Sequence, residues 1–461
     1  MDIKNIKTAY FLGIGGIGMS AIARYFNHLG IKVMGYDKTP TALTNELIIE
    51  GIDIHFEDNI EIAINYQLST ENCLVVLTPA VPSNHQEWAW FKNNGFTILK
   101  RSQVLGLISQ NHQTIGVAGT HGKTTTSTLI AHILKQSSVD CSAFLGGIST
   151  NYNTNLLLAN QSINQSTKQP IVVIEADEFD RSFLTLFPTI AIITSTDADH
   201  LDIYGEHNEL KKSFIDYTNR LVHDGTLIIK KELDLTNDVS VNYITYSIES
   251  EADVYAKNIL ITKGNYTFDL VYKGTIINNL QLGIPGLHNV ENAVAASAAC
   301  LMSGVTELEL RNALLGFKGV KRRFEYIIKN DYQVYIDDYA HHPEELRAII
   351  SSVKNMFPTN EIVVVFQPHL FSRTRDFVDG FAESLSLATE VFLLDIYPAR
   401  ELPIDGVTSK IIFDKITSKK HLVSRNELLE SLKKNQPKVF LTLGAGDIDL
   451  LINPIKEILE K

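Results

Sequence analysis

Short apolar runs alternate with amphipathic segments along most of the chain. Such runs are typical of buried strands, and the intervening segments place apolar residues on one helical face, as Leu129, Ile130 and Ile133 do. The clearest runs are TAYFL at 8–12, CLVVLTPAV at 73–81, TIGVA at 114–118, PIVVIEADEFD at 170–180 and PTIAIITSTDADHLD at 188–202. Strands that alternate with helices predict an α/β fold with parallel sheets.

The first strand leads into a glycine loop. TAYFL is followed by GIGGIG, by a helix predicted over 19–29, and by the strand KVMGYD, which ends at Asp37. Gly13, Gly15 and Gly18 match the dinucleotide-binding fingerprint, Gly16 lies in the same loop, and Asp37 follows Gly18 by 19 residues. Taken alone, this pattern favours an NAD-binding domain, and the rest of the chain must decide.

A second glycine loop, GTHGKT at 119–124, follows the run at 114–118 and precedes a helix. Gly119 and Gly122 allow backbone N–H groups to face an anion, and the helix N-terminus adds positive potential. Lys123 can reach outer phosphates, and Thr124 can hold a magnesium ion. The strict motif has a further glycine where this chain has Val117, so the loop is a variant. We predict a nucleotide site here, in preference to an ordinary glycine-rich turn, formed by Gly119, Thr120, His121, Gly122, Lys123, Thr124 and Thr125.

Acidic residues cluster after the next two apolar runs. The first cluster is Glu175, Asp177, Glu178 and Asp180, and the second is Asp197, Asp199, His200 and Asp202. If both strands flank the strand before the phosphate loop, their carboxyl ends meet a bound triphosphate, where carboxylates and phosphate oxygens hold magnesium. Glu175 and His200 are therefore the metal candidates, together with Thr124. The alternative is that these side chains cap helices and face solvent.

Residues 239–286 change character, because polar and apolar residues alternate around turn pairs such as Lys273-Gly274. This pattern predicts an antiparallel elaboration of the central sheet. The following helix opens with Asn289 and Asn292, which suit either helix capping or the edge of an adenine ring, and capping is favoured without further context. A small basic patch then follows, either a solvated loop or a linker that faces phosphate, made of Lys318, Lys321, Arg322 and Arg323.

The last third again alternates strands and helices, which predicts a third α/β unit. VYIDDYAHHPEEL at 334–346 and FQPHLFSRTRDF at 366–377 each place polar residues after a strand, and KVFLTLGAGD ends on glycines 444 and 446. Paired histidines most often have a local structural role, and His341 and His342 lack the spacing of a helical zinc site. We therefore favour substrate binding over metal binding for this pair.

Composition limits the possible partners. With 461 residues and 44% hydrophobic residues, the chain can form two to four domains, each with its own core. A net charge of −12 without a run of lysine or arginine argues against a nucleic-acid or membrane partner. Three cysteines without metal spacing favour a reducing compartment, and no apolar stretch approaches a membrane span. We expect a cytoplasmic protein that is a monomer or a weak homodimer.

Eight segments stand in one order along the chain: GIGGIGMSAIA, GTHGKTTT, EADEFDRSFL, DADHLD, PGLHNVENAVAA, GVKRRFE, DDYAHHP and FQPHLFSRTRDF. Together they resemble the Mur ligases of peptidoglycan synthesis, over nearly the whole chain. GIGGIGMSA and the segment from FQPH to SRTR resemble the branch that adds the first amino acid.

The resemblance implies three domains. Residues 1–105, which close near Arg101 to Gly106, would form a Rossmann-like domain that binds the UDP-sugar. Residues 106–325 would form a central ATP-binding domain, and residues 326–461 a Rossmann-like domain that binds the amino acid. The first glycine loop, with Gly13, Gly15, Gly16, Gly18 and Asp37, would then hold the UDP diphosphate in place of NAD, since the same backbone amides serve any pyrophosphate.

Family roles also transfer to single residues. Lys123 would contact ATP phosphates, while Thr124, Glu175 and His200 would hold Mg²⁺. Asn289 and Asn292 would contact adenine, and Arg323 and Asp338 would reach the nucleotide from across the domain boundary. The catalytic candidates are Lys123, Glu175, His200, His342 and Arg373. Arg373 would contact the amino acid, and Arg375 is expected to pair with an acid such as Asp376 or Asp379.

The implied reaction is ATP-dependent amide formation between UDP-N-acetylmuramate and L-alanine through an acyl phosphate. Two alternatives remain: a recycling ligase that joins a tripeptide to the same UDP-sugar, and a nicotinamide-dependent oxidoreductase fused to an ATPase. Two positions depart from relatives. Phe214 or Ile215 stands where several family members carry a carbamylated lysine, and Leu370 stands where the alanine-adding branch often has a basic residue.

Overall fold

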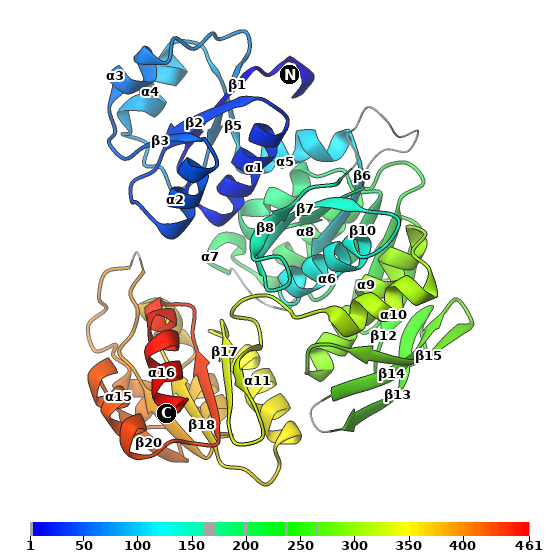
Figure 1. Ribbon diagram of the computed structural model, residues 1–461, viewed down its shortest axis with the longest axis vertical. Coiled ribbons are helices and arrows are strands. Elements are labelled where there is room, and N and C mark those ends of the chain that lie inside the picture. Colours follow the sequence, from blue (N-terminus) through cyan, green and yellow to red (C-terminus); the bar gives the residue numbers. More distant parts are fainter. Residues whose placement is uncertain are drawn as a thin grey trace. The chain divides into compact units, whose positions relative to one another are not determined.

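The computed structural model describes residues 3–160, 171–197, 201–235, 238–262, 265–399 and 401–460. The chain forms two compact units (Figure 1). The first unit comprises Met1–Asn258, Phe268–Leu280 and Glu291–Phe317, and the second comprises Ile259–Thr267, Gln281–Val290 and Lys318–Lys461. Three sheets carry the fold, in agreement with the predicted α/β class.

The N-terminal sheet has the strand order β3-β2-β1-β4-β5 and is parallel throughout. Its strands are β1 (Thr8–Leu12), β2 (Lys32–Tyr36), β3 (Asp53–His55), β4 (Cys73–Leu77) and β5 (Thr97–Lys100). A short 3₁₀ turn, Ile3–Asn5, precedes them, and the helices are α1 (Ile17–His28), α2 (Ala42–Ile49), α3 (Ile60–Asn65), α4 (Gln86–Asn93) and α5 (Arg101–Gln110). Helix α1 starts two residues earlier than the sequence pattern predicts.

The central sheet has the order β15-β14-β13-β12-β11-β10-β6-β9-β7-β8. Its strands are β6 (Gln113–Ala118), β7 (Cys141–Ser149), β8 (Thr154–Leu157), β9 (Ile171–Glu175), β10 (Ile190–Ile193), β11 (Thr226–Lys230), β12 (Tyr243–Ser247), β13 (Val254–Thr262), β14 (Asn265–Tyr272) and β15 (Thr275–Leu282). The helical segments are α6 (Lys123–Lys135), η2 (Phe179–Thr185), α7 (Leu201–Tyr204), α8 (His207–Thr218), α9 (Leu287–Met302) and α10 (Glu307–Gly316).

Strands β9 and β10 lie on either side of β6, and both pair with it in parallel. This arrangement confirms the condition on which the predicted nucleotide site depends, because the acidic strand ends and the phosphate loop share one edge of the sheet.

The predicted antiparallel elaboration is wrong for its first strands. β12 pairs in parallel with β11, and β13 pairs in parallel with β12. Lys273 and Gly274 do form the predicted turn between β14 and β15, with φ of 47° and 83°. Positive φ at both positions is the geometry of a type I′ hairpin. Alternating polarity indicates that a strand is buried on one face, but it does not indicate whether the strand pairs in parallel or antiparallel.

The third sheet has the order β16-β17-β21-β18-β19-β20, with β16 antiparallel to β17 and the other pairs parallel. Its strands are β16 (Glu325–Lys329), β17 (Val334–Asp338), β18 (Ile362–Phe366), β19 (Glu390–Leu393), β20 (Lys419–Leu422) and β21 (Val439–Leu443). The helical segments are α11 (Pro343–Met356), α12 (Phe371–Asp376), α13 (Val378–Leu385), α14 (Lys410–Phe413), α15 (Arg425–Lys434), η3 (Asp447–Leu451) and α16 (Ile452–Leu459).

A continuous apolar core in the first unit fixes α1 against the central sheet. Phe11 and Phe26 belong to the same buried cluster as Phe144 and Ile174. Tyr25 packs edge-on against Phe144, with the ring centroids 5.2 Å apart. This packing holds the glycine loop before α1 close to the strand end that carries Glu175. Among the described residues, no helix has the length and apolarity needed to cross a membrane.

Candidate active site

The loop between β6 and α6 has the backbone geometry of an anion cradle. Gly119 and Gly122 adopt φ of +137° and +80°, in the left-handed region that disfavours residues with a side chain. Space is also restricted, since a Cβ on Gly119 would lie 2.1 Å from Thr194 Oγ1. Both predicted loop glycines are therefore required by conformation and by packing.

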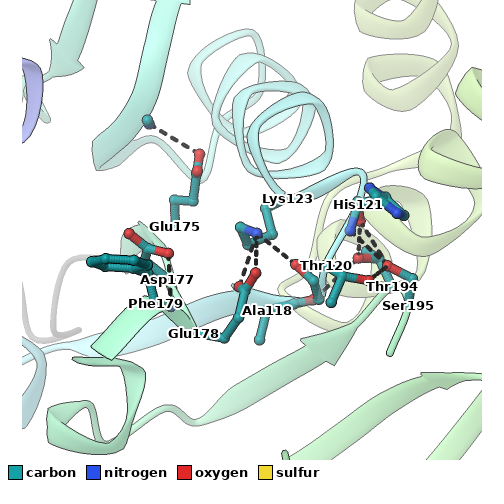
Figure 2. Close-up of polar contacts among 12 residues, drawn as sticks. Ala118, Thr120, His121, Lys123, Glu175, Asp177, Glu178, Phe179, Thr194 and Ser195 are labelled. Carbon is teal, nitrogen blue, oxygen red and sulfur yellow. Dashed lines mark hydrogen bonds and ion pairs between the residues drawn. The ribbon is translucent and has the colours of Figure 1, made fainter. Parts of the chain in front are cut away.

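Two residues after β10 hold this loop in shape. The His121 N–H donates to Ser195 Oγ over 2.7 Å, and the hydroxyls of Thr120 and Ser195 are 2.9 Å apart (Figure 2). Thr194 Oγ1 donates to the carbonyl oxygen of Ala118 over 3.2 Å and also to that of His121. Side-chain hydrogen bonds within the protein thus fix the shape of the cradle. Thr125 lies half-buried in the first turn of α6.

Lys123 is held by an internal carboxylate. Its Nζ lies 2.8 Å from both Oε1 and Oε2 of Glu178 and donates to the Gly119 carbonyl oxygen over 2.7 Å (Figure 2). The Glu178 side chain is completely buried. Burial of the ammonium opposes its charge, but the carboxylates of Glu178, Asp177 and Glu175 outweigh burial and raise the pKa of Lys123. The lysine therefore remains charged at neutral pH.

Glu178 is a residue of the site that the sequence interpretation did not single out. It is one of four acids after β9, and sequence spacing alone does not show which acid turns inward toward the lysine. The Tyr204 hydroxyl donates to the Glu178 carbonyl oxygen over 2.6 Å and fixes this turn.

Glu175 and Thr124, two of the predicted metal ligands, lie together. Thr124 Oγ1 donates to Glu175 Oε1 over 3.0 Å, and the Gly146 N–H donates to Glu175 Oε2 over the same distance. Mg²⁺ prefers oxygen ligands and is commonly held by one or two carboxylates together with substrate phosphates. A carboxylate and a hydroxyl at the mouth of the phosphate loop fit that requirement.

His200, the third predicted ligand, lies outside the described residues, and its role remains a prediction. Among the residues that are described, no cluster of three or more His, Cys, Asp or Glu side chains could hold a metal ion. Phe214, one of the two residues at the position predicted to lack a lysine, is buried in α8 and packs edge-on against Phe183.

The two predicted adenine contacts behave differently. Asn292 lies beside the phosphate loop: its Oδ1 accepts a hydrogen bond from Thr126 Oγ1 over 3.2 Å, and a Cβ on Gly122 would lie 2.7 Å from the same oxygen. Asn289 Nδ2 donates to the Pro285 carbonyl oxygen over 2.5 Å. Asn289 therefore ties the start of α9 to the preceding loop, which is a structural use of its amide.

The N-terminal glycine loop is tied to the acid at the end of β2. The Gly15 N–H donates to Asp37 Oδ2 over 2.7 Å, and Asp37 Oδ1 accepts from the Thr39 N–H over 3.2 Å. Gly13 has φ of +85°, and Gly16 caps α1 at its N-terminus. In this chain Asp37 therefore shapes the loop itself, whereas in an NAD-binding domain the corresponding acid binds a ribose hydroxyl.

A cavity of about 280 Å³ joins this loop to the acidic strand end. Gly16 and Gly18 line one side, and Gly146, Glu175 and Asp177 line another. All of these residues belong to the first unit. A ligand that fills the cavity would touch the N-terminal glycine loop and the strand end with Glu175 at once.

Arg101 lines the same cavity and was predicted only as a domain boundary. A Cβ on Gly18 would lie 2.5 Å from Arg101 Nη1, and Nη2 lies 3.8 Å from Asp177 Oδ2. The guanidinium thus lies between the first turn of α1 and the acids after β9. No motif marks an arginine at the start of α5, so only the fold identifies it.

In the second unit, Arg322 and Arg323 have different surroundings. Arg322 Nε donates to the buried Asp337 over 3.1 Å, and its Nη2 donates to the Gly444 carbonyl oxygen over 2.7 Å. Both guanidinium groups lie over the Tyr339 ring, 5.3 and 5.2 Å from its centroid, but Arg323 has its nearest carboxylate, that of Glu345, 4.0 Å away. Arg322 therefore has a structural role, and Arg323 is the half-exposed member of the pair.

Asp338 fixes the loop at the end of β17. Its carboxylate accepts hydrogen bonds from the N–H groups of Phe324 and Ala340 over 2.6 and 2.7 Å. Burial raises the pKa of Asp338 to about 6, against the opposing charge of Arg323.

The two histidines after β17 occupy local positions. His342 caps α11, and its ring packs edge-on against Phe377 with the centroids 4.7 Å apart. His341 Nδ1 lies 2.9 Å from the Tyr339 carbonyl oxygen, and its ring lies 6.1 Å from that of His369. A helix cap is a structural position for His342, and a role in catalysis stays a prediction.

Arg373 and Arg375 separate as their spacing predicts. Arg375 Nε donates to Asp376 Oδ1 over 2.7 Å in an exposed ion pair, which confirms the expected partner. Arg373 is half-buried near two histidines: burial, together with the charges of His341 and Arg373, lowers the pKa of His369 to about 4. The imidazole of His369 is therefore neutral at pH 7 and leaves Arg373 as the fixed cation of this group.

Leu370, the residue before α12, has φ of +71° and ψ of 137°. A backbone with positive φ and extended ψ is strained for a leucine and is found where surrounding structure enforces it. Here the Leu370 N–H donates to the Tyr397 carbonyl oxygen over 2.9 Å, and Thr374 Oγ1 donates to the Leu370 carbonyl oxygen over 2.7 Å.

Comparison with known proteins agrees with this arrangement. Three family models match the chain: the Mur ligase family catalytic domain at residues 8–113, the Mur ligase middle domain at 117–300, and the Mur ligase glutamate ligase domain at 322–446. Among curated proteins, a UDP-N-acetylmuramate–L-alanine ligase of Flavobacterium johnsoniae is 49% identical over 100% of both chains. One of Porphyromonas gingivalis is 51% identical over 99% of each chain.

Among solved structures, the UDP-N-acetylmuramate-alanine ligase of Thermotoga maritima matches with a TM-score of 0.78 and 29% identity over 98% of each chain. Full-length identity near one half, together with family models in the expected order, establishes the family. The chain belongs to the Mur ligase family.

Proposed function

We propose that this protein is an ATP-dependent ligase that forms an amide between the lactyl carboxylate of UDP-N-acetylmuramate and the amine of L-alanine. The observation that carries the proposal is the cavity of about 280 Å³, in which the glycine loop before α1 and the strand end with Glu175 line one space. A UDP-sugar bound at the first loop would extend its sugar toward the phosphate loop. Relatives that match over the full length are named for this activity.

The chemistry needs two displacements. The lactyl carboxylate takes the γ-phosphoryl group of ATP, which releases ADP and leaves an acyl phosphate. The amine of alanine then attacks the acyl carbon and releases inorganic phosphate, while the ammonium loses its protons to solvent. A free carboxylate is a poor acceptor for an amine at neutral pH, and phosphorylation supplies the leaving group.

The protein's own residues mainly position the substrates and neutralise the negative charge of the phosphates. The N–H groups of the loop at 119–122 would hold the phosphates, and Lys123 would exchange Glu178 for a phosphate oxygen. Thr124 and Glu175 would hold Mg²⁺ in this arrangement, with His200 as the proposed further ligand. The ion, when bound, spreads the charge of the transferring phosphoryl group. Asn292, beside Gly122, is proposed to face the adenine ring, with Asn289 on the same helix.

The remaining assignments are also part of the proposal. Arg323 and Asp338 would contact the nucleotide, and His342 would support the amino acid. We retain residues 1–105, 106–325 and 326–461 as the proposed domain boundaries. We also propose that the protein is a monomer or a weak homodimer and that it is cytoplasmic.

The proposal is tested by coupled measurement of ADP release from the full chain with ATP, Mg²⁺ and UDP-N-acetylmuramate. We expect turnover with L-alanine, and none above background with the tripeptide that a recycling ligase would use. Turnover with the tripeptide and not with alanine would establish the recycling activity. Saturable NADH fluorescence changes without a response to UDP-N-acetylmuramate would support the oxidoreductase alternative.

Arg373 is proposed to bind the carboxylate of alanine. Its planar fork can make two parallel hydrogen bonds, and a lysine keeps the charge but loses the fork. We expect Arg373→Lys to raise the KM for alanine about tenfold and to leave the KM for ATP nearly unchanged, in steady-state assays of ADP release. The matched control is Arg375→Lys, because Arg375 already pairs with Asp376 at the surface. If only the Arg375 variant impairs alanine kinetics, the assignment is reversed.

A further inference from the structure

A second cavity, of about 490 Å³, lies at the carboxyl edge of the third sheet. Its walls come from the segments that follow β18, β19, β20 and β21, all within the second unit. β21 is the last strand in the sequence but lies between β17 and β18 in the sheet. The strand order therefore changes direction beside β18. In open α/β sheets, ligands bind at such points, and the volume is that of a small-molecule site. Arg373 does not line this cavity.

Gln367, the first residue after β18, lines the cavity and carries a buried acceptor. Its side-chain Nε2 donates to Asp447 Oδ1 over 2.9 Å, and because a carboxylate only accepts, this bond fixes the orientation of the amide. Gln367 Oε1 is left without a hydrogen-bond partner among the described residues, although Gln367 is only 5% exposed. A buried acceptor without a donor is costly, and a bound donor would satisfy it.

Gly446 preserves the space around this oxygen. A Cβ at that position would lie 2.6 Å from Gln367 Oε1 and 2.7 Å from Cβ of Tyr397. Any other residue at 446 would therefore press on the amide and on the aromatic ring that lines the cavity.

The charges around the cavity favour a cationic donor. Asp395 contributes an exposed carboxylate after β19, and Asp447 contributes a second one that pairs with Arg425 at the start of α15. With two carboxylates against one arginine, the charged side chains of the wall carry more negative than positive charge. Leu394, Val423 and the Tyr397 ring supply an apolar wall.

We propose that this cavity is a second binding site, for a small molecule that carries a primary ammonium group on an apolar body larger than alanine. The ammonium donates to Gln367 Oε1 and faces Asp395, while the apolar body covers Leu394 and Val423. The site is separate from the proposed alanine contact at Arg373 and does not depend on the ligase reaction.

Isothermal titration calorimetry on the full chain, without ATP or UDP-sugar, tests the site with L-leucyl-L-leucinamide. Its N-acetylated form is the matched control ligand, because acetylation removes the positive charge and keeps the apolar body. We expect one equivalent of the free amine to bind and the acetylated form to bind at least about tenfold more weakly. Equal affinity of the two forms, or no binding of either, overturns the proposal.

Two variants locate the binding. Asp395→Asn removes the exposed carboxylate, and Gln367→Met removes the buried acceptor at similar volume. Each should weaken binding of the free amine about tenfold. Asp414→Asn, at an exposed acid that pairs with Lys410 outside the cavity, should not. Binding that survives Asp395→Asn, or that excess L-alanine displaces, would place the ligand elsewhere and refute the assignment.

Discussion

Replacing Lys123 by alanine should lower the rate of ADP release at least about a hundredfold, since loss of one charge-stabilising donor costs roughly 2.7 to 4 kcal/mol of transition-state stabilisation. The side chain is positioned for this role, because its Nζ already lies 2.7 Å from the carbonyl oxygen of Gly119 at the entrance to the cradle. The measurement is the steady-state rate with saturating UDP-N-acetylmuramate and L-alanine.

The same substitution leaves Glu178 as a buried carboxylate without its lysine, and this cost to folding could itself reduce activity. The double variant Lys123→Ala, Glu178→Gln removes that charge. We expect the double variant to recover thermal stability and to remain inactive. Recovery of activity along with stability would show that Lys123 is structural and does not act on the phosphates.

Arg101→Met should raise the KM for UDP-N-acetylmuramate roughly 10- to 150-fold, because a hydrogen bond to a charged group contributes about 1.5–3 kcal/mol. Arg101 is the cationic side chain among the described residues that line the cavity of about 280 Å³, and the proposed substrate brings a diphosphate and a carboxylate. Steady-state kinetics with varied UDP-sugar provide the test.

Arg24→Met serves as the matched control. Arg24 lies in α1, the helix whose first turn is next to Arg101. It pairs with Glu46 and Glu50 and does not line the cavity. Its loss should lower thermal stability and leave the KM for the UDP-sugar unchanged. An unchanged KM in Arg101→Met, or a raised KM for ATP alone, would contradict the role given to Arg101.

Local patterns in the sequence predict the parts of this site that lie on short stretches of chain. The glycines of the phosphate loop, Lys123 and Thr124 share one turn, and strand-end acids reach them because β9 and β10 flank β6. Apolar runs predict such buried parallel strands well, since both faces of the strand are covered.

Contacts between distant segments could not be predicted in the same way. Arg101 is adjacent to Gly18 only because α1 and α5 pack side by side on the folded chain, and a single sequence carries no mark of that contact. Glu178 was visible as one acid among four, but its inward direction depends on the turn that Tyr204 holds. The parallel pairing of β12 and β13 was missed because side-chain alternation is the same for either strand direction.

The ion pair between Lys123 and Glu178 also bears on selectivity among anions. Because the lysine's charge is already balanced inside the protein, a sulfate or orthophosphate ion that enters the loop must compete with a buried carboxylate at 2.8 Å. A lone small anion brings few additional contacts to offset that competition. A nucleoside triphosphate brings the base, a chain of phosphates and its accompanying cation, and the summed contacts can draw the lysine outward. The internal carboxylate thus raises the affinity that an anion needs in order to occupy the cradle, which favours a nucleotide over inorganic phosphate.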